Sequence, residues 1–360
     1  SDGENMFEIL MPAHRITNAD LLGQKQVRPI TLYVNSEVGD DSWTGMHPGR
    51  PKKTIQSAVD ALPAIITFPV RIQVAPGMYP EQVLIKNRHV NAPTANIHII
   101  SEKNESAIHP RAIVTGKDNE TSPPVRNNGF LLDNVSDIIL EGFGVESTTC
   151  EGIFINKGQI EINDFRVTES LTNAGIKCVE FSNLVLRNTS ITKSVSGVSA
   201  VTQSTVKAYD CIIEDMSPYH GFSGTGGSTL ALYNCSISNC HGSGAIAFYM
   251  ATISLFDCNI SNCGKGNYFW GFECWDNSFG KLYATKISNC VTGGVKASRS
   301  GYIQFRPHPD TSKKCEVINN PVGLRAEMLS AIENFEGISL ILNNTINISS
   351  NQNGYFYYIP

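Results

Sequence analysis

The chain has 360 residues, of which 17 % are charged, and a formal net charge of −5 at pH 7. This balance and the lack of any basic run argue against nucleic acid as a partner. No apolar run reaches the roughly 18 residues of a membrane-spanning helix, so we expect no membrane insertion.

Residues 1–30 are polar and poorly patterned, which predicts an N-terminal arm or linker. His14, Asp20 and Gly23 form a His-x-x-x-x-x-Asp-apolar-x-Gly pattern. The pattern resembles segments that precede receptor-binding modules in phage tail fibres. That resemblance implies contacts with other phage tail proteins through the N-terminus.

Residues 31–100 are predicted to form a capping segment and the first coils of a repeated body. Thr54 can cap a short helix that Pro63 ends. Its apolar residues share one face and are Ile55, Ala58, Val59 and Leu62. We expect this amphipathic helix to plug the open N-terminal end of the body.

The body is predicted to span residues 101–348. Within it, a glycine followed by alternating apolar residues recurs nine times, at intervals of 22 to 29 residues. The repeat glycines are Gly129, Gly152, Gly175, Gly197, Gly221, Gly244, Gly271, Gly294 and Gly323. A fixed period built from short strands is typical of a solenoid. We therefore predict an all-β chain folded as a right-handed parallel β-helix.

Six of the ten cysteines recur once per repeat, at two positions. The first set is Cys211, Cys235 and Cys258, and the second, in which each follows an asparagine, is Cys240, Cys263 and Cys290. Stacked small residues at coil corners account for both sets. We predict free structural cysteines, which fits synthesis in a reducing cytosol.

The C-terminal segment 349–360 contains five aromatic or apolar residues in a row, from Tyr355 to Ile359. Such a segment is too apolar for a solvated tail. We expect it to form a cap over the C-terminal end of the helix or to pack against another subunit.

The region after residue 30 contains Tyr-Val-Asn at 33–35, Gly-x-Asp-x-x-x-Gly at 39–45, Thr-Ile-Gln-x-Ala at 54–58 and Pro-Gly-x-Tyr-x-x-x-Val-x-Ile at 76–85. Together with the repeats, this series resembles pectate-lyase-like β-helix proteins, particularly phage tailspikes, over about residues 30 to 345. The resemblance implies a homotrimer in the virion that binds bacterial surface polysaccharide and cleaves it as a capsule or O-antigen depolymerase. A non-catalytic tail adhesin or structural tail protein, and an extracellular bacterial lyase or hydrolase, remain alternatives.

Side chains two and four residues after each repeat glycine should point outward. From the sixth repeat onward these positions become aromatic and charged, and they hold Phe248, Glu273, Trp275, Lys296, Arg325 and Glu327. The two longest repeats add segments that contain Tyr268, Trp270, Arg306 and His308. Exposed aromatic rings beside charged groups suit a carbohydrate chain.

Two reactions fit these residues. A glycosidase needs two carboxylates, and the candidates are Glu273 with Asp276 on one coil, or with Glu327 two coils away. A polysaccharide lyase needs a base and a cation beside the substrate carboxylate. The candidates for these roles are Lys296, Arg299, Arg325 and His308.

Simpler explanations exist for the same residues. Glu273 and Lys296 can form a surface ion pair, which contributes little. Trp275 and Phe248 can belong to a subunit interface. We predict neither a metal nor a cofactor, because the cysteine and histidine spacing matches no zinc site. The paired active-site aspartates of pectin methylesterases, one in a Gln-Asp-Thr and the other in an Asp-Phe context, are not found as a pair. The Asp-rich calcium cluster and the Arg-x-Pro-x-x-Arg run of pectate lyases are also missing.

Overall fold

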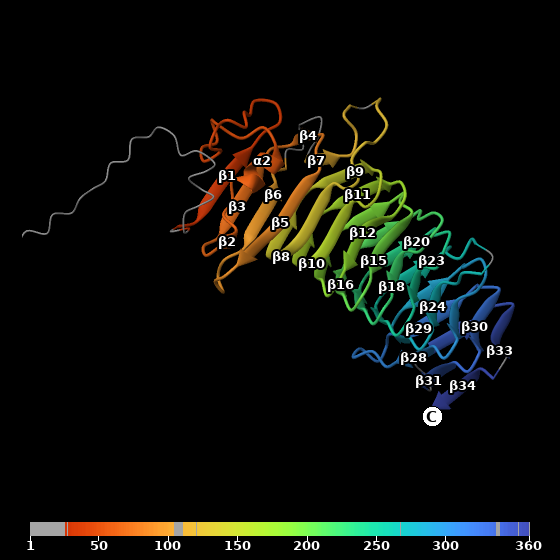
Figure 1. Cartoon of the computed structure of the whole chain (residues 1–360). Helices are drawn as coiled ribbons and strands as arrows, with labels where there is room; N and C mark the ends of the chain where they lie inside the picture. The colour runs from red at the N-terminus through yellow and green to blue at the C-terminus, as the bar shows by residue number, and fades with distance from the viewer. Residues whose placement is uncertain are drawn as a thin grey trace, which may run out of the picture.

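The computed structural model describes residues 26, 28–103, 111–119, 121–266, 268–335, 339–351 and 353–359. Its strands stack side by side along one long axis from the N-terminal to the C-terminal end (Figure 1). The predicted all-β, right-handed parallel β-helix is confirmed. The predicted arm lies outside the described residues, except for its last few positions.

Each coil contributes one strand to each of three faces, and each strand pairs in parallel with its counterpart one coil later. The first face contains β5 (Val83–Val90), the first halves of β8 (Phe130–Glu141) and β10 (Ile153–Asn163), β12 (Ala174–Val179), β15 (Ser196–Ala200), β18 (Phe222–Gly224), β21 (Ala245–Ala247), β24 (Phe272–Trp275), β27 (Val295–Ser298), β30 (Val322–Glu327) and β33 (Ile346–Asn351). The short β2 (Ile65–Ile66) pairs with the end of β5.

The second face follows the first after a short corner, which is three or four residues long from β12 onward. It contains β1 (Ile30–Val34), β3 (Val70–Val74), β6 (Ile97–Ser101), the second halves of β8 and β10, β13 (Asn183–Arg187), β16 (Thr205–Tyr209), β19 (Thr229–Tyr233), β22 (Thr252–Phe256), β25 (Phe279–Tyr283), β28 (Tyr302–Arg306), β31 (Ala331–Phe335) and β34 (Tyr355–Ile359).

The third face closes each coil with short strands. It contains β4 (Gly77–Tyr79), β7 (Ala112–Thr115), β9 (Gly144–Thr148), β11 (Arg166–Ser170), β14 (Ser190–Thr192), β17 (Ile212–Glu214), β20 (Ser236–Ser238), β23 (Asn259–Ser261), β26 (Lys286–Ser288), β29 (Cys315–Ile318) and β32 (Ser339–Leu342).

The repeat glycines are required because the chain passes very close to itself where the third face meets the first. A Cβ atom on Gly197 would lie 2.3 Å from the carbonyl oxygen of Gly221, on the next coil. The same atom would lie 2.6 Å from Cγ2 of Ile213 on the third face. Since backbone atoms cannot move aside, only glycine fits at this position.

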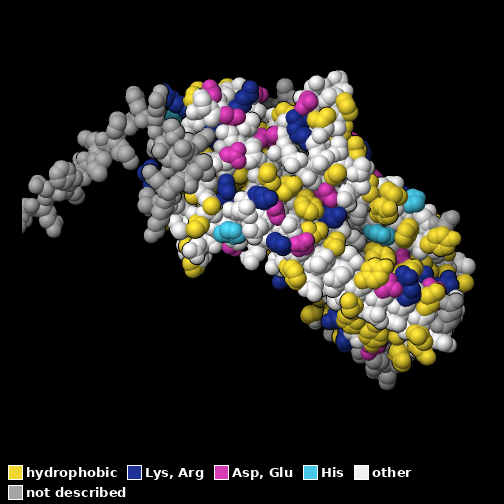
Figure 2. Space-filling view, viewed as in Figure 1, with side chains coloured by type: hydrophobic (Ala, Val, Ile, Leu, Met, Phe, Trp, Pro, Cys, Tyr) yellow, Lys and Arg dark blue, Asp and Glu magenta, His cyan; other side chains and the backbone are white. Residues whose placement is uncertain are grey.

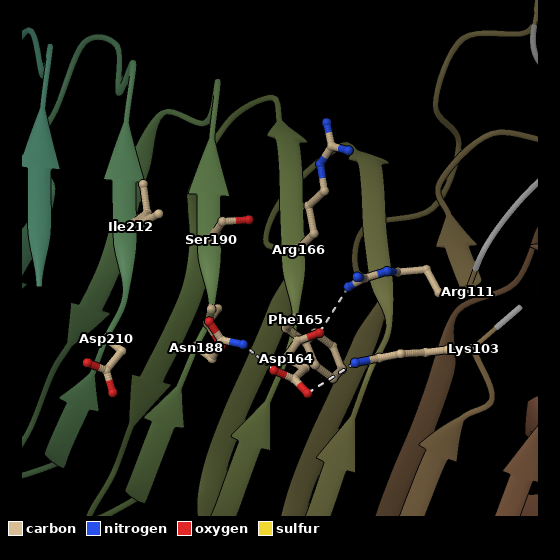
Figure 3. A pocket seen from close by; sticks show the side chains of 10 residues that line it. Lys103, Arg111, Asp164, Phe165, Arg166, Asn188, Ser190, Asp210 and Ile212 are labelled. Carbon is tan, nitrogen blue, oxygen red and sulfur yellow. Dashed lines mark hydrogen bonds and ion pairs between the residues drawn. The ribbon is translucent and has the colours of Figure 1, made fainter. Parts of the chain in front are cut away.

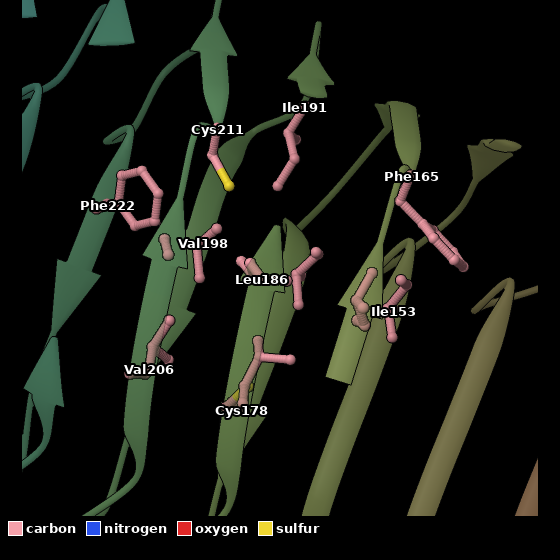
Figure 4. Close-up of a cluster of buried hydrophobic side chains, with 14 of the residues drawn as sticks. Ile153, Phe165, Cys178, Leu186, Ile191, Val198, Val206, Cys211 and Phe222 are labelled. Carbon is pink, nitrogen blue, oxygen red and sulfur yellow. The ribbon is translucent and has the colours of Figure 1, made fainter. Parts of the chain in front are cut away.

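The core is a continuous column of apolar side chains that alternate with outward ones along each strand. Figure 4 shows Ile153, Val198 and Phe222 from the first face, with Leu186 from the second and Ile191 from the third, pointing into this column. All five side chains are buried. Burial of this kind supplies the main driving force for folding.

The predicted cysteine positions are confirmed. All ten cysteines are free, and those of the two predicted sets are buried. Asn239, Asn262 and Asn289, which precede the second set, have φ angles of 57°, 55° and 55°. Asparagine tolerates this left-handed conformation better than most residues, which explains its recurrence at the corner.

The predicted N-terminal helix is α2 (Ile55–Asp60), and the hydroxyl of Thr54 accepts a hydrogen bond from the backbone N–H of Ser57. The helix buries Ile55, Ala58 and Val59. Its action as an end plug stays a prediction. Within the described ranges, no helix is long and apolar enough to cross a membrane.

The aromatic C-terminal segment forms β34, which pairs in parallel with β31. Tyr355 and Tyr357 are about half exposed, at 49 % and 52 %. The segment therefore continues the second face. That it covers the end of the helix or contacts another subunit stays a prediction.

Candidate functional site

Charged side chains meet on the first face of the C-terminal coils. The register of β24, β27 and β30 places Glu273 beside Lys296, and Lys296 beside Arg325. Figure 2 shows hydrophobic, basic and acidic side chains close together on the C-terminal half of the molecule. This group of residues matches the composition predicted for the outward positions.

The half-buried indole of Trp275 lies at the centre of the group. Nζ of Lys296 and Cζ of Arg299 each lie 4.7 Å from the centroid of its ring. The ring of Phe248, one coil earlier, lies 6.2 Å away. Cations over an aromatic ring are attracted to its π electrons, so these contacts hold the two basic groups beside the ring.

Glu273 is completely buried beneath this surface. Its Oε1 accepts hydrogen bonds from the hydroxyl of Ser243 at 2.5 Å and the backbone N–H of Trp270 at 2.8 Å. Its Oε2 accepts one from Nε1–H of Trp275 at 2.7 Å. Burial raises the pKa of Glu273, although these hydrogen bonds and the charge of Lys296 oppose the shift. As placed, the carboxylate holds other groups in position and does not reach the surface.

The expected exposure of Trp270 is wrong, because its side chain is only 2 % exposed. The extra residues of the 27-residue repeat fold back over Glu273, and the indole packs against the next coil. A Cβ on Gly293 would lie 2.3 Å from that ring. Tyr268, from the same extra residues, is 80 % exposed and stays a candidate contact for a ligand.

Glu327 is the carboxylate that pairs with the basic groups. Its Oε1 lies 2.7 Å from Nζ of Lys296, and its Oε2 lies 3.0 Å from Nε of Arg325. Ser298 donates a further hydrogen bond to it at 3.2 Å. Burial alone would raise the pKa of Glu327. The hydrogen bond from Lys296 and the positive charges of Lys296 and Arg325 outweigh this effect, so the pKa is lowered overall. The suggested surface ion pair between Glu273 and Lys296 is therefore wrong.

Asp276 lies at the corner that follows β24, with a φ angle of 53°. Its Oδ1 lies 3.0 Å from Nε of Arg299. Its Oδ2 is buried and has no hydrogen-bond partner in the described part of the chain. The carboxylate thus helps to hold Arg299 over the Trp275 ring.

Arg306 and His308 do not join this group. Arg306 ends β28 on the second face, where its Nε donates to Oε1 of Gln304 at 2.9 Å. Nε2 of His308 lies 3.1 Å from Oδ2 of Asp257, a residue at the corner between the second and third faces. Neither contact involves the residues around Trp275.

Two residues that we did not select from the sequence adjoin Phe248. Nδ1 of His220 accepts a hydrogen bond of 2.9 Å from the backbone N–H of Ser243. Burial lowers the pKa of this histidine to about 4. Its ring lies 6.1 Å from that of Phe248. Tyr249 follows Phe248 at the corner and is 60 % exposed. The place of His220, one residue before a repeat glycine, is the signal that could have identified it.

Residues 174–353 match the family described as right handed beta helix region. A lacto-N-biosidase from Eubacterium ramulus is 9 % identical with a TM-score of 0.58, over 92 % of this chain and 68 % of that one. A pectate lyase is 12 % identical with a TM-score of 0.57, over 91 % and 80 %. The enzymatically active domain of bacteriophage CBA120 tailspike protein 2 is 14 % identical with a TM-score of 0.52, over 91 % and 46 %. No curated protein matches the chain. At these identities the likeness to solved structures establishes the fold alone.

Proposed function

Because the chain belongs to the family of right-handed beta helix regions, we propose that it binds a polysaccharide on the first face around Trp275. The cluster of Trp275, Lys296 and Arg299 carries this proposal. A half-buried aromatic ring offers an apolar surface to the faces of sugar rings, while the basic groups beside it donate hydrogen bonds to hydroxyls or carboxylates. The exposed Tyr249, whose ring lies 6.3 Å from that of Phe248, extends the aromatic surface, and the exposed Tyr268 is a further candidate contact.

We further propose that the polysaccharide belongs to a bacterial surface, as capsule or O-antigen, and that the chain is the receptor-binding or depolymerase part of a phage tailspike. The Thr-Ile-Gln-x-Ala and Pro-Gly-x-Tyr patterns support this origin, as does the shared fold with a phage tailspike. On this proposal the protein is a homotrimer in the virion. The same fold in a pectate lyase keeps a secreted bacterial enzyme as an alternative.

For cleavage, Glu273 and Glu327 form the best pair of carboxylates. Their surroundings change their pKa values in opposite directions, which is how one carboxyl group serves as an acid while the other stays ionised. They lie two coils apart, and a separation of about 4.8 Å per coil suits an inverting hydrolase better than a retaining one. Because Trp275 and Trp270 cover Glu273, this reaction requires Trp275 to move when substrate binds.

Binding without cleavage is the second candidate. It is favoured by the complete burial of Glu273 and by the ion pairs that engage Asp276 and Glu327. A binding protein needs only the aromatic surface, whereas an enzyme needs two titratable groups that reach the same sugar.

The test is incubation of the purified protein with capsule and O-antigen preparations from a panel of bacteria. New reducing ends without ultraviolet absorbance of an unsaturated uronate would support hydrolysis, and both signals together would support a lyase. Retention of a polysaccharide on the protein without either signal would support the binding protein. If no polysaccharide is retained or cleaved, the proposed function is wrong.

Once a polysaccharide has been found, one substitution and its matched control distinguish cleavage by Glu327 from binding without cleavage. Glu327→Gln should abolish turnover and leave binding within a few-fold if Glu327 takes part in cleavage. Glu161→Gln, in an ion pair with Arg187 away from Trp275, is the matched control. Equal turnover in the two variants would exclude Glu327 from the reaction.

A further inference from the structure

A hollow of about 260 Å³ opens at the border of the second and third faces, several coils before Trp275. Side chains from separate coils line it, and Figure 3 shows Lys103 and Arg111 pointing toward Asp164 from one side. Arg166 lies above Asp164 in the same view, with its guanidinium pointing away from that carboxylate, and Ile212 lies farther along the third face, two coils after Arg166. The hollow is therefore built from residues that are far apart in the sequence.

Asp164 fixes two of the basic groups. Nζ of Lys103 lies 3.3 Å from its Oδ2, and Nη1 of Arg111 donates to its backbone carbonyl oxygen at 3.0 Å. The amide of Asn188 donates to Oδ1 of the same carboxylate. Lys103 and Arg111 are thus held in place, while each keeps further N–H groups for another partner.

Arg166 is the basic group of the hollow that has no hydrogen-bond or ion-pair partner among the described residues. It occupies an outward position of β11, and its neighbours on the adjacent coils are Gly144 and Ser190. Neither neighbour has a side chain long enough to reach the guanidinium. Among the described residues, no carboxylate or carbonyl group contacts this guanidinium.

The charges and the size of the hollow limit what it can bind. The basic side chains in its lining are Lys103, Arg111 and Arg166, and the acidic ones are Asp164 and Asp210. The lining therefore has a net positive charge. Ile212 is 50 % exposed and adds an apolar wall. Pockets for larger organic ligands usually have about 300 to 1,000 Å³, so this one suits a single small unit.

We propose that this hollow binds one acidic sugar residue, whose carboxylate pairs with Arg166 and Arg111 and whose ring lies against Ile212. Arginine suits this role because its planar donors match a carboxylate in pairs. The proposal does not rest on the function proposed for the first face, because it concerns other residues on other coils. It adds a second sugar site that selects anionic glycans.

The test uses the full chain and three probes in ligand-observed NMR titrations, namely methyl β-glucuronide, methyl β-glucoside and inorganic phosphate. The glucuronide should bind, and its neutral counterpart should not. Arg166→Ala should weaken glucuronide binding about tenfold or more, because it removes a charge-assisted pair. Ile212→Ala should weaken binding of the glucuronide and leave phosphate unaffected.

Lys286→Ala is the matched control. Lys286 occupies the equivalent outward position of the third face on a later coil, where it pairs with Glu316 at 3.2 Å. This variant loses the same charge and should keep full glucuronide binding. Unchanged affinity in Arg166→Ala, or an equal loss in both variants, would overturn the proposal. Binding of phosphate as tight as that of the glucuronide, insensitive to Ile212→Ala, would overturn the assignment to a sugar.

Discussion

Nε1–H of Trp275 donates a hydrogen bond of 2.7 Å to Oε2 of Glu273, two residues earlier on the same strand. The buried carboxylate thereby fixes the orientation of the indole, while Lys296 and Arg299 hold its ring from outside. A ring that is already held in place loses little freedom when a ligand stacks on it. Glu273 is therefore a positioning residue for the proposed binding surface, whether or not it also takes part in cleavage.

Loss of the Glu273 carboxylate should destabilise the late coils. Glu273→Ala would leave the hydroxyl of Ser243, the N–H of Trp270 and the indole N–H of Trp275 without their acceptor. Unsatisfied buried donors cost about 1 to 3 kcal/mol each, so we expect a loss of about 3 kcal/mol or more. Urea unfolding measures this change, with Glu161→Ala as the control that should shift stability by less than about 1 kcal/mol. Equal shifts in the two variants would show that these hydrogen bonds contribute nothing.

His220 should make the protein less stable in mild acid. The unfolded chain binds a proton at this residue near pH 6.5, whereas burial lowers the pKa in the folded state to about 4. Since the unfolded state then binds more protons, the free energy of unfolding should fall as the pH drops from about 6.5 toward 4. His220→Asn keeps an acceptor for the N–H of Ser243 and should reduce this dependence.

Urea unfolding at about pH 7 and pH 5 provides the measurement for His220. His241→Asn is the control, because its side chain is exposed at a neighbouring corner. If the wild type and His220→Asn lose the same stability between the two pH values, burial of the imidazole is not the cause.

The stacked glycines should tolerate no side chain. Gly197→Ala would place a methyl group against the carbonyl oxygen of Gly221, at a point where the backbone leaves no free space. Overpacking of this kind costs about 1 to 3 kcal/mol, so the midpoint of urea unfolding should fall clearly. Ser199→Ala, an outward change on the same strand, should leave it nearly unchanged. A Gly197→Ala variant as stable as the wild type would contradict the packing explanation for the repeat.

The fold could be predicted because each coil repeats the same packing and backbone requirements, and few residue types meet them. Gly197 avoids a clash with the next coil, Asn239 adopts a left-handed corner, and Cys240 fills the narrow interior behind it. Each requirement recurs once per coil, so the sequence displays it several times. Strand periodicity likewise placed Glu273, Lys296 and Arg325 correctly on one face.

The site was harder to predict, because periodicity tells which way a side chain points and not what lies over it. Glu273 points outward, yet the extra residues that end at Trp270 cover it. Arg306 ends a strand of the second face and His308 follows that strand, so their distance from Trp275 depends on where each coil turns. The hollow beside Arg166 involves contacts between coils that no single repeat reveals.

The most direct test of the proposed binding surface compares the affinity of Trp275→Ala and Tyr283→Ala for the polysaccharide that the wild type retains. Tyr283 is a half-buried aromatic residue on the second face, stacked on Phe256 and away from Lys296 and Arg299. We predict that Trp275→Ala weakens binding about tenfold or more, while Tyr283→Ala binds like the wild type. Full affinity in Trp275→Ala would contradict the account and place the polysaccharide on another face of the β-helix.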